Sequence, residues 1–272
     1  MPYNRLYRGD FQRARQQHPD WPSVVSEGDS WFSYELRGNV IDRLDDPLDT
    51  APNNQQRWAL LRLEQGGDEI GEILSGGQRA YLRKEVFETF EGIDALLFSA
   101  GGNDVIGPDL LPLLREFEPG DLPVQDRVHG DRLDRRLGQI ESLLLELIDL
   151  GAQTQPDMEI YMHGYDVPER LGEAARLVKF RVAGPWILPH FVTRGYGAHR
   201  ELVREILRYL IDRFNNMLAG IADQYEKFHH VDLRGVVRTD WADEIHPNRS
   251  GAIRVAERFQ APLHARFPEL LP

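Results

Sequence analysis

Short, almost continuous apolar runs alternate along the chain with stretches in which apolar residues recur every three or four positions. The runs are typical of buried strands, and the stretches are typical of amphipathic helices. The expected strands cover residues 23–27, 58–63, 93–100, 158–162 and 228–233. The expected helices cover residues 70–74, 78–90, 133–148, 198–227 and a last segment that ends near 267. Because strands and helices alternate, we predict an α/β fold with a parallel sheet covered by helices on both faces.

Four segments lack either pattern. Residues 1–22 are polar and aromatic and are expected to form a partly helical lead-in. Residues 37–56 are polar and are expected to be a loop. Segments of about 105–130 and 163–197 are rich in proline and are expected to be insertions that wall a pocket. We therefore predict the lead-in followed by a single α/β domain, 23–272, that carries both insertions.

Composition narrows the classes of function. The chain has 272 residues, of which 41% are hydrophobic and 28% are charged, enough for one sizeable core. The formal net charge of -12 argues against non-specific nucleic-acid binding, so no nucleic-acid partner is expected. Cysteine is absent, which excludes disulfides, a thiolate nucleophile and a sulfur-bound metal.

Targeting signals are not visible in the sequence. The first ten residues lack the apolar core of a signal peptide, and no uncharged apolar run is long enough to cross a bilayer. No transmembrane segment is therefore expected, and a cytoplasmic location is the default expectation. Export by a route that reads no such signal stays open, as does the oligomeric state.

Polar clusters follow several of the expected strands. Three of them are Gly28-Asp29-Ser30, Gly101-Gly102-Asn103-Asp104 and His163-Gly164-Tyr165-Asp166. In a parallel sheet the carboxyl ends of the strands share one edge, and ligands bind outside that edge. We therefore expect these clusters to lie together.

A nucleophile and a base can be assigned among these residues. The turn at Gly28 would lift the hydroxyl of Ser30 out of a strand end, and His246 is the best candidate base for it. Asp243 precedes His246 by three residues, so its carboxylate can hold the imidazole in one tautomer. The competing interpretation is that Asp243 and His246 only cap and turn the start of the last helix.

Acyl transfer also needs donors aimed at the developing oxyanion. The side chain of Asn103 and the backbone N–H groups of Gly67 and Ser30 are the candidates. Gly67 is preferred to Gly76, because a strand-like run precedes it and a helix capped by Asp68 is expected to follow it.

Four blocks in this order resemble the SGNH hydrolases, also called GDSL esterases and lipases. The blocks are Gly28-Asp29-Ser30, Gly67-Asp68, Gly101-Gly102-Asn103-Asp104 and Asp243-Glu244-Ile245-His246-Pro247, and they span residues 24–250. The resemblance implies a flavodoxin-like, three-layer α/β/α fold with five parallel strands and neither a metal nor an organic cofactor.

The resemblance also implies site residues. Ser30 would be the nucleophile, His246 the general base and Asp243 its orienting acid, with Gly67 and Asn103 completing the oxyanion hole. Trp31 stands where the pattern of the family has leucine, and it is expected to change the packing under the nucleophile or to line the acyl pocket.

The sequence therefore predicts a serine-dependent carboxylic ester hydrolase that acts through an acyl-enzyme on a small-molecule or lipid ester. It does not choose between lipid and sugar esters, nor an acyl-chain length. His163 and Tyr165 are candidate substrate contacts, although a histidine hydrogen-bonded in a crowded loop is the favoured interpretation of His163. Two alternatives remain: a metal-dependent hydrolase using Asp29, His163, Asp166 and His246, and a non-catalytic protein that binds an acyl or glycan ligand.

Overall fold

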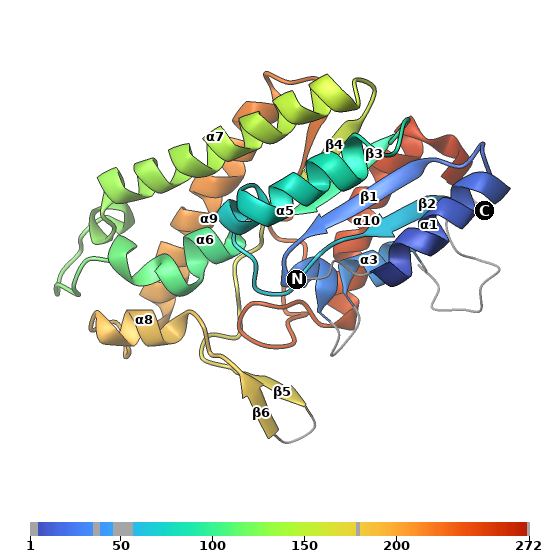
Figure 1. Ribbon diagram of the computed structural model, residues 1–272. Helices are drawn as coiled ribbons and strands as arrows, with labels where there is room; N and C mark the ends of the chain where they lie inside the picture. The colour runs from blue at the N-terminus through green and yellow to red at the C-terminus, as the bar shows by residue number, and fades with distance from the viewer. Residues whose placement is uncertain (1–4, 35–38, 46–56, 178–179, 271–272) are drawn as a thin grey trace.

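The computed structural model describes residues 5–34, 39–45, 57–177 and 180–270 (Figure 1). Its strands are β1 (Ser23–Gly28), β2 (Ala59–Arg62), β3 (Ala95–Ser99), β4 (Glu159–His163), β5 (Ala175–Leu177), β6 (Phe180–Ala183) and β7 (Phe228–Val231). Its α-helices are α1 (Arg5–Gln17), α2 (Ser30–Ser33), α3 (Val40–Asp45), α4 (Ile70–Ile73), α5 (Gly76–Tyr81), α6 (Gly102–Ile106), α7 (Gly130–Thr154), α8 (Leu188–Thr193), α9 (Arg200–Ala222) and α10 (Arg249–Arg266). Shorter 3-10 or π-helical turns are η2 (Leu82–Phe87), η3 (Pro108–Leu113), η4 (Val124–Arg127) and η5 (Pro268–Leu270).

Five strands form one parallel sheet in the order β2-β1-β3-β4-β7. Every residue of β1, β3 and β4 is buried, as expected for inner strands covered on both faces. In the register of the sheet, Val25 of β1 pairs with Leu61 of β2 and with Leu96 of β3. Figure 1 shows α5 and α7 over one face and α3 and α10 over the other. The predicted α/β fold with a five-stranded parallel sheet is confirmed.

Several helices differ from their prediction. The expected helix 78–90 is divided into α5 and the π-helical turn η2, whose wider winding buries Leu82, Val86 and Phe87 together. Asp68 does not cap α4. Glu69 does so, in a capping box with Glu72.

The segment 37–56 is not all loop, because α3 lies within it; the rest of that segment, apart from Asn39, falls outside the described residues. Val40, Ile41 and Leu44 of α3 are buried, and α3 contacts α10. An apolar set this short gives too little periodicity to be recognised in the sequence.

The lead-in and the two expected insertions hold short elements. In the lead-in, α1 buries Phe11 edge-on against Phe90. The segment 105–130 contains η3 and η4, and the segment 163–197 contains α8 and the antiparallel hairpin of β5 and β6, which projects from the sheet in Figure 1. The division into a lead-in and one domain stays a prediction. Within the described ranges, no helix is long and apolar enough to cross a membrane.

Candidate active site

The candidate nucleophile lies at the end of β1, where the backbone turns sharply into α2. Gly28 has a φ of +150°, and a Cβ added there would lie 2.3 Å from the carbonyl oxygen of Ser99 on the neighbouring strand. Only glycine allows this approach. Asp29 then caps α2 by accepting a hydrogen bond from the N–H of Trp31 at 3.0 Å. Ser30 is therefore the first residue of a helix, at the carboxyl edge of the sheet.

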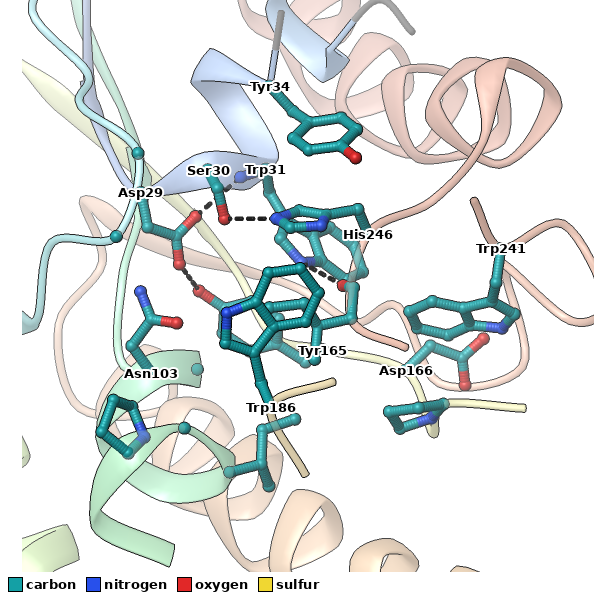
Figure 2. Close-up of a pocket in the computed structure, with 18 residues that line it drawn as sticks. Asp29, Ser30, Trp31, Tyr34, Asn103, Tyr165, Asp166, Trp186, Trp241 and His246 are labelled. Carbon is teal, nitrogen blue, oxygen red and sulfur yellow. Dashed lines mark hydrogen bonds between the residues drawn. The ribbon is translucent and has the colours of Figure 1, made fainter. Parts of the chain in front are cut away.

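Ser30 lies beside the imidazole of His246. The distance from Ser30 Oγ to His246 Nε2 is 2.9 Å (Figure 2). His246 Nδ1 lies 2.9 Å from both carboxylate oxygens of Asp243. Asp243 also accepts from the backbone N–H groups of Ile245 and His246, so the loop between the two side chains is closed on itself. The structure thus brings together the three residues predicted as nucleophile, base and orienting acid.

Burial and hydrogen bonding act in opposite directions on Asp243. Its side chain has no exposed surface, and this burial by itself raises the pKa of the carboxyl group. The hydrogen bonds from His246 and from the backbone N–H groups outweigh burial, so the pKa of Asp243 is lowered. Asp243 is therefore ionised at neutral pH and faces Nδ1 as an acceptor, the arrangement that leaves Nε2 for a hydroxyl.

Tyr34 is a further contact of this group that the sequence did not indicate. Its ring is stacked on the imidazole of His246, with centroids 4.0 Å apart and planes 13° apart, and its hydroxyl donates to Asp243 at 2.9 Å. The two partners lie more than 200 positions further along the chain, so no local pattern could have found this contact.

Trp31 connects the turn at Ser30 to the loop that carries His246. Its indole N–H donates to the carbonyl of Ile245 at 3.0 Å, and its ring contacts those of Tyr165 and Trp241 edge-on. Trp31 is 5% exposed and lines the cavity in front of Ser30. Trp31 thus packs beside Ser30 and lines the cavity, and whether an acyl group binds there stays a prediction.

The candidate oxyanion donors face the same cavity. Ser30, Gly67 and Asn103 all line it, whereas Gly76 does not. Asn103 Nδ2 donates to the carbonyl of Asp68 at 3.0 Å, which holds the loop around Gly67 against α6. This hydrogen bond uses one of the two hydrogens on the amide nitrogen of Asn103, so the second hydrogen is left for another acceptor. The backbone N–H of Ser30, in the first turn of α2, has no acceptor within the helix. The placement supports Gly67 over Gly76.

His163 does not reach the cavity, so its predicted contact with substrate is wrong. The side chain has no exposed surface; its Nε2 lies 2.7 Å from Ser99 Oγ, and its Nδ1 contacts the carbonyl of Gly164. Burial lowers the pKa of His163 to about 4, so the imidazole is neutral. His163 is hydrogen-bonded, as in the favoured interpretation, but it is the last residue of β4 and does not lie in a loop.

Tyr165 does line the cavity, and its hydroxyl is already engaged. It donates to Asp29 at 2.5 Å, while Ser99 Oγ lies 2.6 Å from the other carboxylate oxygen. Burial raises the pKa of Asp29, and the hydrogen bonds from Ser99 and Tyr165 oppose this shift. The hydroxyl hydrogen of Tyr165 is therefore already donated to Asp29.

The residues of the alternative metal site point to separate protein partners. Asp166 accepts from the backbone N–H groups of Val167, Gly235 and Val237, each at 2.8 Å. Asp29 and His163 are engaged as described above. In the described part of the chain, no group of three or more His, Asp or Glu side chains is arranged to hold a metal ion.

The cavity has a volume of about 280 Å³ and a mainly aromatic and aliphatic wall. The residues that form this wall include Trp31, Tyr34, Ile106, Trp186, Trp241 and Ile245. Figure 2 shows Ser30 and His246 at one side of the cavity and Asn103 and Trp186 nearby. The arrangement presents a hydroxyl, a base and N–H donors to an apolar chamber.

Comparisons with family models and with curated proteins give no match. Comparison with solved structures gives several. The lipase Lip_vut3 from a goat rumen metagenome is 14% identical, with a TM-score of 0.55 over 88% of this chain and 96% of that one. A carbohydrate acetylesterase family member from Sinorhizobium meliloti is 16% identical, with a TM-score of 0.52 over 91% and 99%.

An extracellular lipase from Streptomyces rimosus is also similar. It is 15% identical, with a TM-score of 0.50 over 87% of this chain and 98% of that one. At such identities the likeness concerns the fold. The chain therefore has the fold of these lipases and of this acetylesterase, which agrees with the resemblance of its four sequence blocks to the SGNH hydrolases.

Proposed function

We propose that this protein is a serine-dependent carboxylic ester hydrolase of the SGNH type. The observation that carries the proposal lies at the wall of an apolar cavity: Ser30 Oγ is 2.9 Å from His246 Nε2, and His246 Nδ1 is 2.9 Å from the carboxylate of Asp243. A hydroxyl becomes a useful nucleophile only when such a base takes its proton. The likeness in fold to lipases and esterases supports the same reaction class.

The first half of the proposed reaction forms an acyl-enzyme. Ser30 Oγ attacks the ester carbonyl carbon while His246 Nε2 takes the hydroxyl proton, and Asp243 stabilises the imidazolium. The carbonyl oxygen gains negative charge, and in this proposal the N–H groups of Ser30, Gly67 and Asn103 stabilise it. The bond from the carbonyl carbon to the alcohol oxygen then breaks, and His246 returns the proton to the leaving alcohol.

The second half releases the acid. A water molecule attacks the acyl carbon while His246 Nε2 takes its proton, and the bond to Ser30 Oγ breaks as that oxygen regains a proton from His246. The products are one alcohol and one carboxylic acid. Apart from the ester and one water molecule, each step uses only groups of this chain.

The test is hydrolysis of p-nitrophenyl esters from acetate to palmitate by the wild type and by Ser30→Ala. We expect kcat/KM to fall by at least about a thousandfold in the variant, as for loss of a triad nucleophile. Ser33→Ala is the matched control, because it removes another hydroxyl from α2 that donates to the carbonyl of Asp29. The control should keep wild-type activity.

Two results would contradict the proposal. Activity that survives Ser30→Ala would favour another mechanism, and a chelator would then test the metal-dependent alternative. A wild type that hydrolyses none of the esters and forms no adduct with a serine-directed organophosphonate would favour the non-catalytic binding protein.

A further inference from the structure

For the proposed ester hydrolysis, on which this inference rests, the cavity beside Ser30 offers a substrate little electrostatic attraction. Among the described residues, those that line the cavity include no Lys or Arg. Its two carboxylates, Asp29 and Asp166, are 2% and 5% exposed and are occupied by the donors described above. An anionic group would find no cation there and would lose its hydration, so the cavity suits an uncharged part of the substrate.

Trp186 forms a part of the wall beside the candidate base. Its ring is edge-on to the imidazole of His246, with centroids 5.4 Å apart and planes 87° apart. It is only half-buried, and Figure 2 shows it extending across the cavity. A Cβ added at Gly184 would lie 2.5 Å from this ring, so the glycine makes room for the indole. An aromatic surface is therefore open to a substrate next to the reacting atoms.

Glu244 fixes the backbone that carries Trp186 through hydrogen bonds. Its carboxylate is fully buried and accepts from the backbone N–H groups of Trp186, Ile187, Leu188 and Gly172. The last three of these contacts measure 2.7–2.8 Å. Glu244 is also the residue that follows Asp243, so one short loop carries the acid, the base and the anchor of Trp186.

These four hydrogen bonds hold the segment that carries Trp186 in one position. Truncation of Glu244 would leave four backbone N–H groups without their acceptor, two of them buried. The position of Trp186 is thus set by the same loop that sets His246. An aromatic group stacked on Trp186 would lie in a fixed relation to the base.

We propose that the cavity binds the uncharged aromatic group of an ester against Trp186, and that Glu244 is the residue that positions Trp186 for this selection. A cavity of about 150 Å³ holds benzene. The 280 Å³ here has room for one aromatic ring together with an acetyl group. Contact between two aromatic rings adds enough free energy to favour an aromatic over a saturated ring by about threefold to tenfold.

The test compares benzyl acetate with cyclohexylmethyl acetate. The two esters share the acyl group and the carbon count, and both release a primary alcohol of similar acidity, so the aromatic ring is the main difference. We expect the wild-type ratio of kcat/KM to favour benzyl acetate by about threefold to tenfold. A ratio at or below one overturns the proposal.

Variants assign the preference to its residues. Trp186→Leu should bring the ratio close to one, and Trp186→Phe should keep most of it. Glu244→Gln should also lower the ratio, mainly through a higher KM for benzyl acetate, because an amide has one acceptor oxygen in place of two. Val192→Thr, at a 54% exposed position of α8, should leave the ratio unchanged.

The outcomes separate this inference from the proposed function. Hydrolysis of both esters with no aromatic preference, or a wild-type ratio in Trp186→Leu, overturns the inference alone. Absence of hydrolysis of either ester by a wild type that also fails the p-nitrophenyl test overturns both. If Glu244→Gln does not fold, the two Trp186 variants still decide whether the ring selects the substrate.

Discussion

The ring of Tyr34 lies flat on the imidazole of His246 while its hydroxyl donates to Asp243. During the proposed reaction the imidazole becomes a cation and the carboxylate opposite it must stay aligned. A ring face next to a cation is favourable, and the hydroxyl fixes one carboxylate oxygen. Tyr34 therefore acts on the base in two ways, through its ring and through its oxygen.

Removal of the hydroxyl alone should cost part of the rate. Tyr34→Phe keeps the stacked ring and loses one hydrogen bond, so we expect kcat to fall by about threefold to tenfold with little change in KM. Tyr34→Leu should lower kcat further. Tyr209→Phe is the control, because its hydroxyl accepts from Arg213 on α9. An unchanged kcat in Tyr34→Phe would show that the hydroxyl does not position Asp243.

The carboxyl group of Asp104 makes the free energy of unfolding depend on pH. Burial raises the pKa of its carboxyl group from 3.8 to about 6, partly opposed by the hydrogen bond from the N–H of Ile70. Between these two pH values the folded chain holds a proton that the unfolded chain has lost. The free energy of unfolding therefore decreases as pH rises through this window, by about 3 kcal/mol in total for a shift of this size.

Asp104→Asn should remove this dependence. The amide oxygen can still accept from Ile70, but the side chain no longer ionises. We expect the variant to gain stability over the wild type between pH 4 and pH 7, by up to about 3 kcal/mol. Urea unfolding of both proteins across this range measures the difference. A difference that stays constant with pH would contradict the assignment to Asp104.

The sequence revealed only some of these residues, for a physical reason. Asp243 and His246 are three positions apart, and Ser30 and Asn103 follow buried strands, so local spacing and the shared sheet edge predict their meeting. Tyr34 and Glu244 act through contacts made 209 and 56–72 positions away. Such contacts depend on how distant loops pack against each other, and local residue patterns do not predict this packing.

At the scale of elements, α6 is placed by its glycines. Gly101 has a φ of +94°, and a Cβ there would lie 2.6 Å from the ring of Phe214 on α9. A Cβ at Gly102 would lie 2.6 Å from the ring of Tyr165. The two glycines let α6, which carries Asn103, approach both rings. The two glycines therefore allow close packing of α6 and also fix the position of Asn103.

Gly101→Ala should destabilise the fold. The change combines an unfavourable left-handed backbone with overpacking against Phe214, so we expect a loss of about 2–5 kcal/mol in the free energy of unfolding. Gly138→Ala in α7 is the matched control: nothing lies within 4 Å of a Cβ there, and alanine should stabilise the helix by about 0.5–1 kcal/mol. Equal effects of the two changes in urea unfolding would contradict this account.

Strands were predicted better than short elements. The inner strands are continuous apolar runs because both of their faces are covered, and that pattern is readable. The hairpin of β5 and β6 and the helix α3 are short and lie in polar or proline-rich sequence, where local preference is weak. The turn η2 looks like ordinary helix in sequence, because a π-helical turn buries nearly the same positions.

At the scale of the molecule, the chain has a formal net charge of -12. No Lys or Arg among the described residues lines the cavity. An anionic substrate is therefore repelled at long range by the whole surface and gains no partner on arrival. The long-range part should respond to salt, since the Debye length falls from about 30 Å at 0.01 M to about 3 Å at 1 M. The cost of desolvation in the cavity should not.

The effect of charge can be measured by comparing kcat/KM for 4-carboxybenzyl acetate with kcat/KM for benzyl acetate. At low salt the carboxylated ester should have a kcat/KM at least about tenfold lower, as expected for an ion that is repelled and left unpaired. Raising the salt from about 0.01 M to about 1 M should recover part of that difference and leave benzyl acetate nearly unchanged. A difference that does not change with salt would place the whole discrimination inside the cavity. Equal hydrolysis of the two esters at low salt would show that neither the net charge nor the apolar wall selects against anions.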